Sequence, residues 1–368
     1  MNTVRLIKDN GWDSLKELAI SISNHPQERV PLRILNYSQL DSPKTHPVVM
    51  ECRSLILDYG ANVASKSFTR FFNVGEATEI TDKFDWTNYK AFEKVDGSLT
   101  QMFCYNGEWM MATRSTFGQW KMEDTNFTWE DLFWSLLKKH HVESVLNPNH
   151  TYVFELCSPY NQVVTLHSEP KLVLLDIVSR DTVFIRGTLD NHISACDYIA
   201  DYLRVQRPKI YNINSKHPQD IKDFVNSMDG SEEGLVIQDY SGMRLKCKNT
   251  SWLARAALKN NNNFYYKDLY DVVWKGETSE VCTYFPLVKE KCQRLEDLIR
   301  SVKTMLKCAY SGVKNEIIQK DFAIKLNQLV LPLRWVLFEC RRHNKTVDEI
   351  FSDSKYYEKI KKGILEQI

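Results

Sequence analysis

The sequence predicts an α+β protein in which antiparallel sheets with flanking helices are followed by an all-α C-terminal domain. Three observations indicate this class. Short runs rich in β-branched and aromatic residues dominate the first 254 residues, hairpin turn signals separate some of these runs, and helical periodicity dominates the remainder. A chain of 368 residues is long enough for two domains, which we expect to span residues 1–254 and 255–368.

The expected strands are short and are joined in two places by turn residues. Asn106-Gly107 separates two apolar runs and is the strongest short-range hairpin signal, while Ser241-Gly242 predicts a second hairpin. Strands joined in this way pair antiparallel, so the sheets should be rich in antiparallel pairs. The expected strands are 49–57, 89–92, 101–105, 108–113, 152–156, 171–178, 234–238 and 243–248.

The expected helices follow from apolar residues that recur on one face. Residues 129–139 form such a pattern, and Thr128 is a suitable N-cap. In the C-terminal domain, apolar residues follow the i, i+3, i+4, i+7 rule over 295–306. Two more segments are expected there, one from about Asn315 that is interrupted near Pro332 and one from about Val347 to the end.

The charge of the chain is unevenly distributed although its net value is only +1. Residues 255–368 contain 21 Lys and Arg against 15 Asp and Glu, whereas residues 1–254 contain 27 against 32. This basic C-terminal domain favours contact with a polyanion, and an ordinary solvated helical surface is the equal alternative. The polar run Asn260–Asn263 is expected to be a linker.

Composition excludes several classes of protein. The chain is 43% hydrophobic, which disfavours disorder, and its longest apolar runs are too short to span a bilayer. The N-terminus has no signal-peptide h-region. The nine cysteines are scattered without a C-x-x-C pair, which argues against a disulfide scaffold or structural zinc site. We therefore expect a cytoplasmic protein that does not enter membranes. As a separate expectation, the protein is a monomer.

The segment Glu93–Ser98, which reads Glu-Lys-Val-Asp-Gly-Ser, is the most informative short motif. It lies between two expected strands, and a lysine at such a glycine-containing turn can project into a cleft. Taken alone, Lys94-x-Asp-Gly is a weak signal, and a surface turn is the favoured interpretation.

Other charged residues interrupt apolar strands in a set order. Glu155 lies among apolar neighbours, where an unpaired carboxylate would be costly to bury. Lys246 and Lys248 alternate and should share one face of their strand. Arg53 and Glu233 also lie in or beside strands. Each could instead be a salt-bridged residue of a sheet.

Together and in this order, these pieces resemble the covalent nucleotidyltransferases, the superfamily of ATP-dependent ligases and capping enzymes. The match covers motif I at Lys94-x-Asp-Gly, motif III at Phe154-Glu155, the next strand at Leu174–Ile177, motif IV at Glu233-Gly234 and motif V at Lys246-x-Lys248. The sequence is more closely similar to the phage T4-type RNA ligase 1 family over about residues 30–255. That similarity is carried by Arg33–Tyr37, Glu51–Arg53, Arg70–Asn73, Glu93–Leu99, Glu232–Val236 and Leu245–Lys248.

The resemblance implies a nucleotidyltransferase (ATP-grasp-like ligase) core and a three-step reaction with ATP and Mg²⁺ or Mn²⁺. Lys94 would form lysyl-AMP, pass AMP to an RNA 5′-phosphate, and allow a 3′-hydroxyl to seal the ends. A lysine with a pKa of about 10.4 must lose its proton before it attacks. Nearby cations lower that pKa and counter phosphate charge, a role suited to Lys246 and Lys248.

The resemblance also implies roles for the remaining residues. Arg53 and Arg70 would hold the triphosphate, and Arg70 replaces a lysine of the T4 enzyme, so it can make bidentate contacts. Tyr37 would contact ATP, Glu155 would accept a hydrogen bond from the ribose, and Glu233 would hold magnesium.

This sequence departs from the family pattern in two places. A lysine-rich segment of the T4 enzyme is replaced here by Arg114 and Thr116, which leaves any role for Thr116 doubtful. A metal-binding carboxylate after motif V cannot be placed, and the candidates are Asp271, Glu277 and Glu280.

The family implies RNA with 5′-phosphate and 3′-hydroxyl ends as the substrate, in particular a nicked tRNA, and a functional link to an end-healing polynucleotide kinase/phosphatase. The C-terminal domain would then select the RNA. A DNA ligase or capping enzyme shares the core but usually appends a β-rich domain after motif V, which the helical period of residues 280–368 disfavours. A catalytically inactive RNA-binding protein would have lost Lys94 or its partners, and all of them are present.

Overall fold

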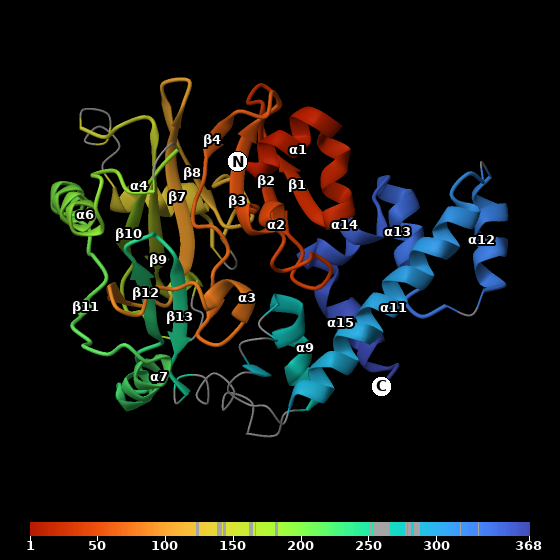
Figure 1. Ribbon diagram of the computed structural model, residues 1–368. Coiled ribbons are helices and arrows are strands. Elements are labelled where there is room, and N and C mark those ends of the chain that lie inside the picture. The colour runs from red at the N-terminus through yellow and green to blue at the C-terminus, as the bar shows by residue number, and fades with distance from the viewer. Residues whose placement is uncertain are drawn as a thin grey trace. The chain divides into compact units, whose positions relative to one another are not determined.

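The structure is a computed structural model of the 368-residue chain (Figure 1). The chain divides into two compact units, one formed by residues 1–38 and 42–259 and the other by residues 39–41 and 260–368. The expected linker Asn260–Asn263 and the expected boundary after residue 254 lie outside the described residues. The structure describes residues 1–122, 125–137, 142, 145–161, 165, 167–180, 183–250, 252, 265–276, 278, 281–282, 288–316, 318–329 and 331–368.

The first unit is built on three sheets within its described residues, and all strand pairs are antiparallel except β13–β5. The first sheet has the order β1-β2-β3-β4, the second β10-β9-β7-β8 and the third β11-β6-β12-β13-β5. The first sheet contains β1 (Ile20–Asn24), β2 (Leu32–Tyr37), β3 (Arg53–Asp58) and β4 (Val63–Ser65). The second contains β7 (Ser98–Tyr105), β8 (Glu108–Thr113), β9 (His150–Cys157) and β10 (Lys171–Ser179). The third contains β5 (Phe72–Asn73), β6 (Tyr89–Glu93), β11 (Ile210–Tyr211), β12 (Gly234–Asp239) and β13 (Arg244–Lys248).

Both predicted hairpins are confirmed. Asn106 and Gly107 join β7 to β8 with φ angles of 51° and 82°, the left-handed conformation that a two-residue hairpin turn of this type needs. Gly242, with φ of 92°, lies in the turn between β12 and β13. These two turns bring the strands that carry the motifs into register.

The strand predicted over 49–57 is wrong in its first part. Pro47–Glu51 forms helix α2, and the strand β3 begins only at Arg53. Pro47 stands in the first helical turn, where the fixed φ of proline favours a helix and its missing N–H costs nothing. Val48 and Val49 lie in this helix and are buried in the core. Their apolar character is therefore explained by a helix as well as by a strand.

Helices flank the sheets of the first unit. Helix α4 begins at the predicted cap, since Thr128 accepts a hydrogen bond from the backbone N–H of Asp131. It ends at Leu136, and residues 138–139 of the predicted helix lie outside the described residues. Helix α6 packs against β10, and α7 packs against β13 (Figure 1). The helices are α1 (Asn2–Asn10), α2 (Pro47–Glu51), α3 (Thr78–Thr81), α4 (Trp129–Leu136), α6 (Leu189–Leu203) and α7 (Pro218–Ser227), with 3₁₀ turns at Trp12–Leu18 and Pro159–Asn161.

Every regular element in the described part of the second unit is helical, as the sequence predicted. The three predicted segments correspond to α11, to α12 and α13 separated at Pro332, and to α14 and α15. Their apolar faces meet in one buried cluster that includes Leu295, Ile299, Val302 and Leu306 of α11. The helices are α9 (Tyr266–Lys275), α11 (Lys289–Val313), α12 (Gln319–Asn327), α13 (Trp335–His343), α14 (Val347–Ser352) and α15 (Tyr357–Leu365), with a 3₁₀ turn at Ser354–Tyr356.

Two further observations concern the helices and the cysteines. Within the described ranges, none of the helices has the length and apolar character needed to cross a bilayer. All nine cysteines are free thiols, and most of them are buried.

Candidate active site

Lys94 lies directly after strand β6, in a turn that the surrounding backbone constrains. Its N–H donates a hydrogen bond of 2.8 Å to the carbonyl of Gly234. A Cβ at Gly97 would lie 2.7 Å from the carbonyl oxygen of Leu156, so only glycine fits at that position. The Asp96 carboxylate accepts a hydrogen bond of 2.6 Å from the N–H of Thr165. The turn therefore presents Lys94 from a fixed backbone.

The ammonium of Lys94 faces a carboxylate that it shares with a second lysine. Lys94 Nζ lies 2.7 Å from Glu233 Oε1, and Lys248 Nζ lies 3.1 Å from the same oxygen. The Glu233 side chain is only 4% exposed. Gly234 makes this proximity possible, because a Cβ there, at φ of 139°, would lie 2.1 Å from the carbonyl oxygen of Cys247.

Glu155 lies in the middle of β9 and is half-buried. Burial raises the pKa of its carboxyl to about 8, and the nearby Glu233 and Asp96 add to this increase, while Lys94 and Arg53 oppose it. Near neutral pH the carboxyl group of Glu155 is therefore mostly protonated in the protein without ligands. A protonated or charged carboxyl here can exchange hydrogen bonds with a hydroxyl group of a ligand.

Four cations surround Tyr37 at the end of β2. Burial alone would raise the pKa of the Tyr37 hydroxyl, but Arg114, Arg70, Arg53 and Lys246 together lower it. The guanidinium carbon of Arg70 lies 4.7 Å from the centroid of the Tyr37 ring, and that of Arg114 lies 5.7 Å from it. Arginines often pack on aromatic faces in this way.

Several donors of this cluster are buried without a partner. Among the described residues, Arg53 Nη1, Arg70 Nε and Arg70 Nη1 have no hydrogen-bond partner. Burial and the neighbouring Arg114 and Arg70 lower the pKa of Arg53 to about 10, while Tyr37 and Glu155 raise it. Buried donors without acceptors are costly, and guanidinium groups match phosphate oxygens. The cluster therefore fits a bound polyanion.

Strand β13 connects the Lys94–Glu233 pair to the cluster of cations at Tyr37. Lys248 lies opposite Gly234 on β12, and Lys246 lies between Val236 on β12 and Asn73 on β5. Both lysines point to the same face of the sheet, with Lys246 affecting Tyr37 and Lys248 contacting Glu233. All eight residues singled out in the sequence thus lie in one electrostatic network.

The structure also places three further residues. Arg114, which the sequence offered as a replacement for one lysine of the T4 enzyme, joins the cluster at Tyr37. Thr116 instead closes that turn, since its N–H donates to Thr113 Oγ1 at 3.1 Å. Trp252 is 4% exposed, and the centroid of its ring lies 5.1 Å from Lys248 Nζ. It therefore belongs to the core.

The metal-ligand candidates after motif V gain no support. In the second unit, Asp271 accepts hydrogen bonds from Tyr357 Oη and, at 2.5 Å, from Lys361 Nζ. Glu277 and Glu280 lie outside the described residues. Within the described part of the first unit, Glu233 is the carboxylate that directly contacts the lysine of motif I.

The fold and the site together define a covalent nucleotidyltransferase, with a lysine in a glycine turn between sheets, acidic neighbours and a cationic strand. The family model described as RNA ligase matches residues 51–272, which is more than half of the chain. The chain therefore belongs to the T4 RNA ligase 1 family of ATP-dependent RNA ligases.

One relative aligns with nearly the whole chain. A protein of Autographa californica nuclear polyhedrosis virus, described as a bifunctional polynucleotide kinase/RNA ligase, is 26% identical over 371 residues. The alignment covers 95% of this chain and 50% of the viral protein. The chain thus spans about half the length of the curated relative that it matches.

Solved structures of RNA ligases also align with part of the chain. The Naegleria gruberi RNA ligase with PPi is 17% identical, with a TM-score of 0.43 over 51% of this chain and 57% of that chain. A lysine-to-alanine mutant of the same ligase with ATP and Mn is 16% identical, with a TM-score of 0.43 over 51% of this chain and 58% of that chain.

Proposed function

We propose that the chain is an ATP-dependent RNA ligase that joins RNA 5′-phosphate and 3′-hydroxyl ends. The observation that carries this proposal is the position of Lys94, whose Nζ lies 2.7 Å from Glu233 in the same network as arginines with unpaired buried donors. A nucleophile beside a polyanion site is what transfer of a nucleotide to lysine requires.

Three transfers follow from this arrangement. Lys94 Nζ forms a bond to the α-phosphorus of ATP, the bond from that phosphorus to the bridging oxygen breaks, and diphosphate leaves. An oxygen of the RNA 5′-phosphate then attacks the AMP phosphorus and breaks its bond to Lys94. Finally the RNA 3′-hydroxyl attacks the 5′-phosphorus, releasing AMP and losing its proton.

The protonation state of Lys94 is the central electrostatic problem of the first step. The ammonium cannot attack, and Lys94 Nζ is paired with the Glu233 carboxylate in the structure. Lys248 contacts the same carboxylate and adds a second positive charge beside it. After attack, Lys246 and Lys248 are placed to counter the charge on the phosphate oxygens.

Glu233 is the residue that we propose to hold Mg²⁺ or Mn²⁺. Its carboxylate provides the hard oxygen ligands that these ions prefer, and it lies beside the lysine of motif I. When bound, the ion would supply positive charge that neutralises Glu233 and the phosphates. Lys94 Nζ would then no longer be paired with the Glu233 carboxylate.

The cluster at Tyr37 is proposed to bind the triphosphate. The unpaired donors of Arg53 and Arg70 supply hydrogen bonds to phosphate oxygens, and their rigid guanidinium groups orient the leaving diphosphate. Arg114 adds a third guanidinium beside Tyr37. Tyr37 is proposed to contact ATP, and Glu155 to hydrogen-bond the ribose.

The proposal extends to substrate and partners. Residues 255–368 are proposed to select the RNA, because their net charge of +6 favours a polyanion. A nicked tRNA is the proposed substrate. The description of the viral relative, which names a polynucleotide kinase, supports a functional link to an end-healing kinase/phosphatase. We propose that the protein acts as a monomer in the cytoplasm.

The proposal is tested by incubating the chain with α-³²P-labelled ATP and Mg²⁺, followed by denaturing electrophoresis and a sealing assay. A label on the protein and joining of 5′-phosphate RNA support it. A labelled protein that passes its label only to DNA nicks would favour a DNA ligase. A protein that is labelled by α-³²P-GTP and not by α-³²P-ATP would favour a capping enzyme. A chain that takes no label at all would support the alternative of an inactive RNA-binding protein.

A further inference from the structure

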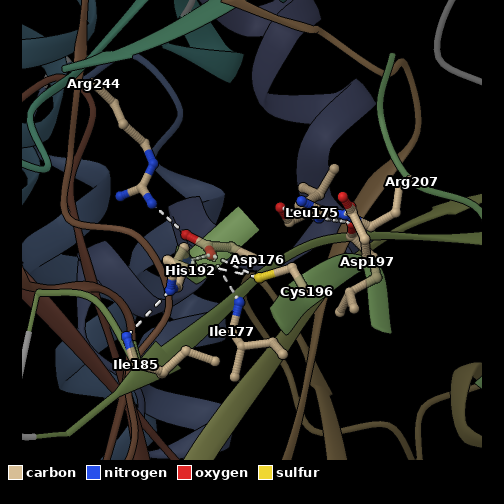
Figure 2. A network of polar contacts seen from close by, with 10 residues as sticks. Leu175, Asp176, Ile177, Ile185, His192, Cys196, Asp197, Arg207 and Arg244 are labelled. Carbon is tan, nitrogen blue, oxygen red and sulfur yellow. Dashed lines mark hydrogen bonds and ion pairs between the residues drawn. The ribbon is translucent and has the colours of Figure 1, made fainter. Parts of the chain in front are cut away.

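A buried polar network lies in the first unit beside the proposed catalytic residues. Asp176 of β10 is 6% exposed, and its carboxylate receives four donors (Figure 2). Those donors are His192 Nε2 at 2.5 Å, Ile177 N–H at 2.8 Å, Cys196 Sγ at 3.7 Å and the guanidinium of Arg244. A buried carboxylate with so many donors is fixed in place.

His192 holds Asp176 in one orientation. Its Nδ1 lies 3.2 Å from the backbone N–H of Ile185, which can only donate, so Nδ1 carries no proton. The other ring nitrogen, Nε2, is directed at Asp176 (Figure 2). Burial would raise the pKa of Asp176, but Arg244 and the His192 hydrogen bond outweigh this and hold it at about 2.

The same atoms could be mistaken for a metal site. Ligand atoms of Asp176, His192 and Cys196 lie within 4.8 Å of one another. Both nitrogens of His192 are already engaged, and the positive guanidinium of Arg244 contacts the same carboxylate. A cation would have to displace a proton and approach a neighbouring positive charge, so the network is better explained by its own ion pair.

A β-bulge directs Asp176 into this network. The pairing between β10 and β9 shifts register between Leu174 and Asp176, so the two strands are locally out of step. The guanidinium of Arg207 fixes the bulge by donating to the carbonyl of Leu175 at 2.7 Å (Figure 2). Bulges re-aim side chains, often next to active sites.

The ion pair ends on the strand that carries both proposed catalytic lysines. Arg244 precedes Lys246 by two residues and Lys248 by four, so all three cations share one face of β13. Arg244 is held from both sides, because its guanidinium carbon also lies 4.7 Å from the centroid of the Phe68 ring. The Asp176–Arg244 pair therefore joins the second sheet to the third at this strand.

We propose that Asp176, oriented by His192, is a positioning residue that fixes strand β13 through Arg244 and thereby sets the positions of Lys246 and Lys248 for lysyl-AMP formation. The inference rests on the proposed function, because it concerns the first step of that reaction. Asp176 touches no reacting atom. It acts through geometry, and misplacement by about 1 Å in such sites costs roughly 10²-fold in rate.

The test uses the full chain with Asp176→Asn, Arg244→Met and the conservative Arg244→Lys. Single-turnover formation of lysyl-AMP is measured against ATP concentration, and rates are expressed per labelled molecule so that unfolded protein does not count. The control is Lys303→Met in the second unit, which removes a cation 13% exposed that pairs with Asp41 at 2.9 Å and Asp348 at 3.0 Å.

We expect the maximal rate of lysyl-AMP formation to fall about 10²-fold in Asp176→Asn and in Arg244→Met. The half-saturating ATP concentration should rise as well, because Lys246 belongs to the cluster at Tyr37 that is proposed to bind the triphosphate. Arg244→Lys keeps the charge and should recover part of the rate, while Lys303→Met should leave both values unchanged. If Asp176→Asn does not fold, Arg244→Lys still tests the inference, because it should lower the rate of lysyl-AMP formation by a smaller factor.

Two outcomes would overturn the inference in different ways. Wild-type rate and ATP dependence in all three variants, with only a lower melting temperature, would show that the network is merely structural. Absence of lysyl-AMP in the wild-type chain would overturn the proposed function and this inference with it.

Discussion

The ammonium of Lys94 forms an ion pair of 2.7 Å with the carboxylate of Glu233, and Lys248 shares the same oxygen at 3.1 Å. An ammonium cannot attack phosphorus, and here the lysine nitrogen is paired with a carboxylate. We propose that a divalent cation on the Glu233 carboxylate replaces this pairing before the first step. Under this proposal, metal dependence and nucleophile activation would have a common origin in one carboxylate.

Lys94→Ala should abolish labelling of the protein by α-³²P-ATP, because it removes the nitrogen that would carry AMP. The measurement is denaturing electrophoresis after incubation with Mg²⁺. Lys90→Ala on strand β6 is a suitable control, since Lys90 pairs with Asp190 at 3.0 Å outside the site. A label that persists in Lys94→Ala would mean that another residue is the nucleophile.

The same variant should separate the chemical steps. Lys94 is consumed only when lysyl-AMP forms, so Lys94→Ala should still join RNA that already carries a 5′-adenylate. Ordinary 5′-phosphate RNA should remain unjoined. Both substrates are followed by gel electrophoresis of end-labelled RNA. Complete loss on both substrates would indicate that Lys94 also positions the RNA end.

Lys246→Ala and Lys248→Ala should each slow lysyl-AMP formation by about 10²–10³-fold, since loss of one oriented donor in such sites costs about 3–4 kcal/mol. Lys248 contacts Glu233 directly, and Lys246 contributes to the field at Tyr37. Single-turnover rates measure the effect. A near-wild-type rate in either variant would show that the substituted lysine has only a structural role in the sheet.

Glu155→Gln should stabilise the ligand-free protein at high pH while it impairs the reaction. Burial raises the pKa of Glu155 to about 8 in the folded chain, so its contribution to stability is greatest below its ordinary pKa and is lost as the pH rises towards 8. The neutral amide avoids this loss. The variant should therefore melt several degrees above wild type at pH 9, where about 1 kcal/mol corresponds to roughly 2–4 °C.

At pH 5 the two proteins should melt at similar temperatures, because the carboxyl of Glu155 is protonated there in the folded chain. Calorimetry without nucleotide or metal provides the comparison. Equal destabilisation of the variant at both pH values would contradict the raised pKa. It would instead show that glutamine does not fit the position.

Local patterns in the sequence were sufficient for much of the fold. Asn106-Gly107 adopts the backbone that its residues favour, and Thr128 caps its helix as its side chain permits. The strand predicted from Val49 is wrong in its first part, because a short apolar run fits a buried helix as well as a strand. Pro47 favours the helix at this position. The alternation of Lys246 and Lys248 was readable for the same local reason.

The rest of the site depends on contacts that no local pattern contains. Asp176 interrupts an apolar run, yet its partner Arg244 lies 68 residues later and meets it only because a bulge turns the carboxylate inward. Arg114 likewise looks like a surface residue of a turn, and its position beside Tyr37 follows from the packing of two sheets. Tertiary structure decides which charges in a sequence become neighbours.

The C-terminal unit should govern the choice of RNA. It is helical in its described residues, and residues 255–368 carry 21 Lys and Arg against 15 Asp and Glu. Contacts from such cations to phosphates bind without reading sequence and weaken with salt. A chain truncated after Lys259, the end of the first unit, should therefore form lysyl-AMP when it folds. It should lose its preference for a broken tRNA stem-loop over a single strand.

The full-length chain permits a sharper test of the same idea. Lys289, Lys291 and Arg294 are exposed at the start of α11. Changing all three to Gln should leave lysyl-AMP formation unchanged and weaken tRNA binding, and the salt slope should fall by about 0.7–0.9 for each cation that no longer neutralises a phosphate. The matched control neutralises three exposed lysines of the first unit, Lys8, Lys16 and Lys83, and should alter binding much less. Unchanged tRNA selectivity in both the truncated chain and the α11 variant would assign substrate choice to the first unit.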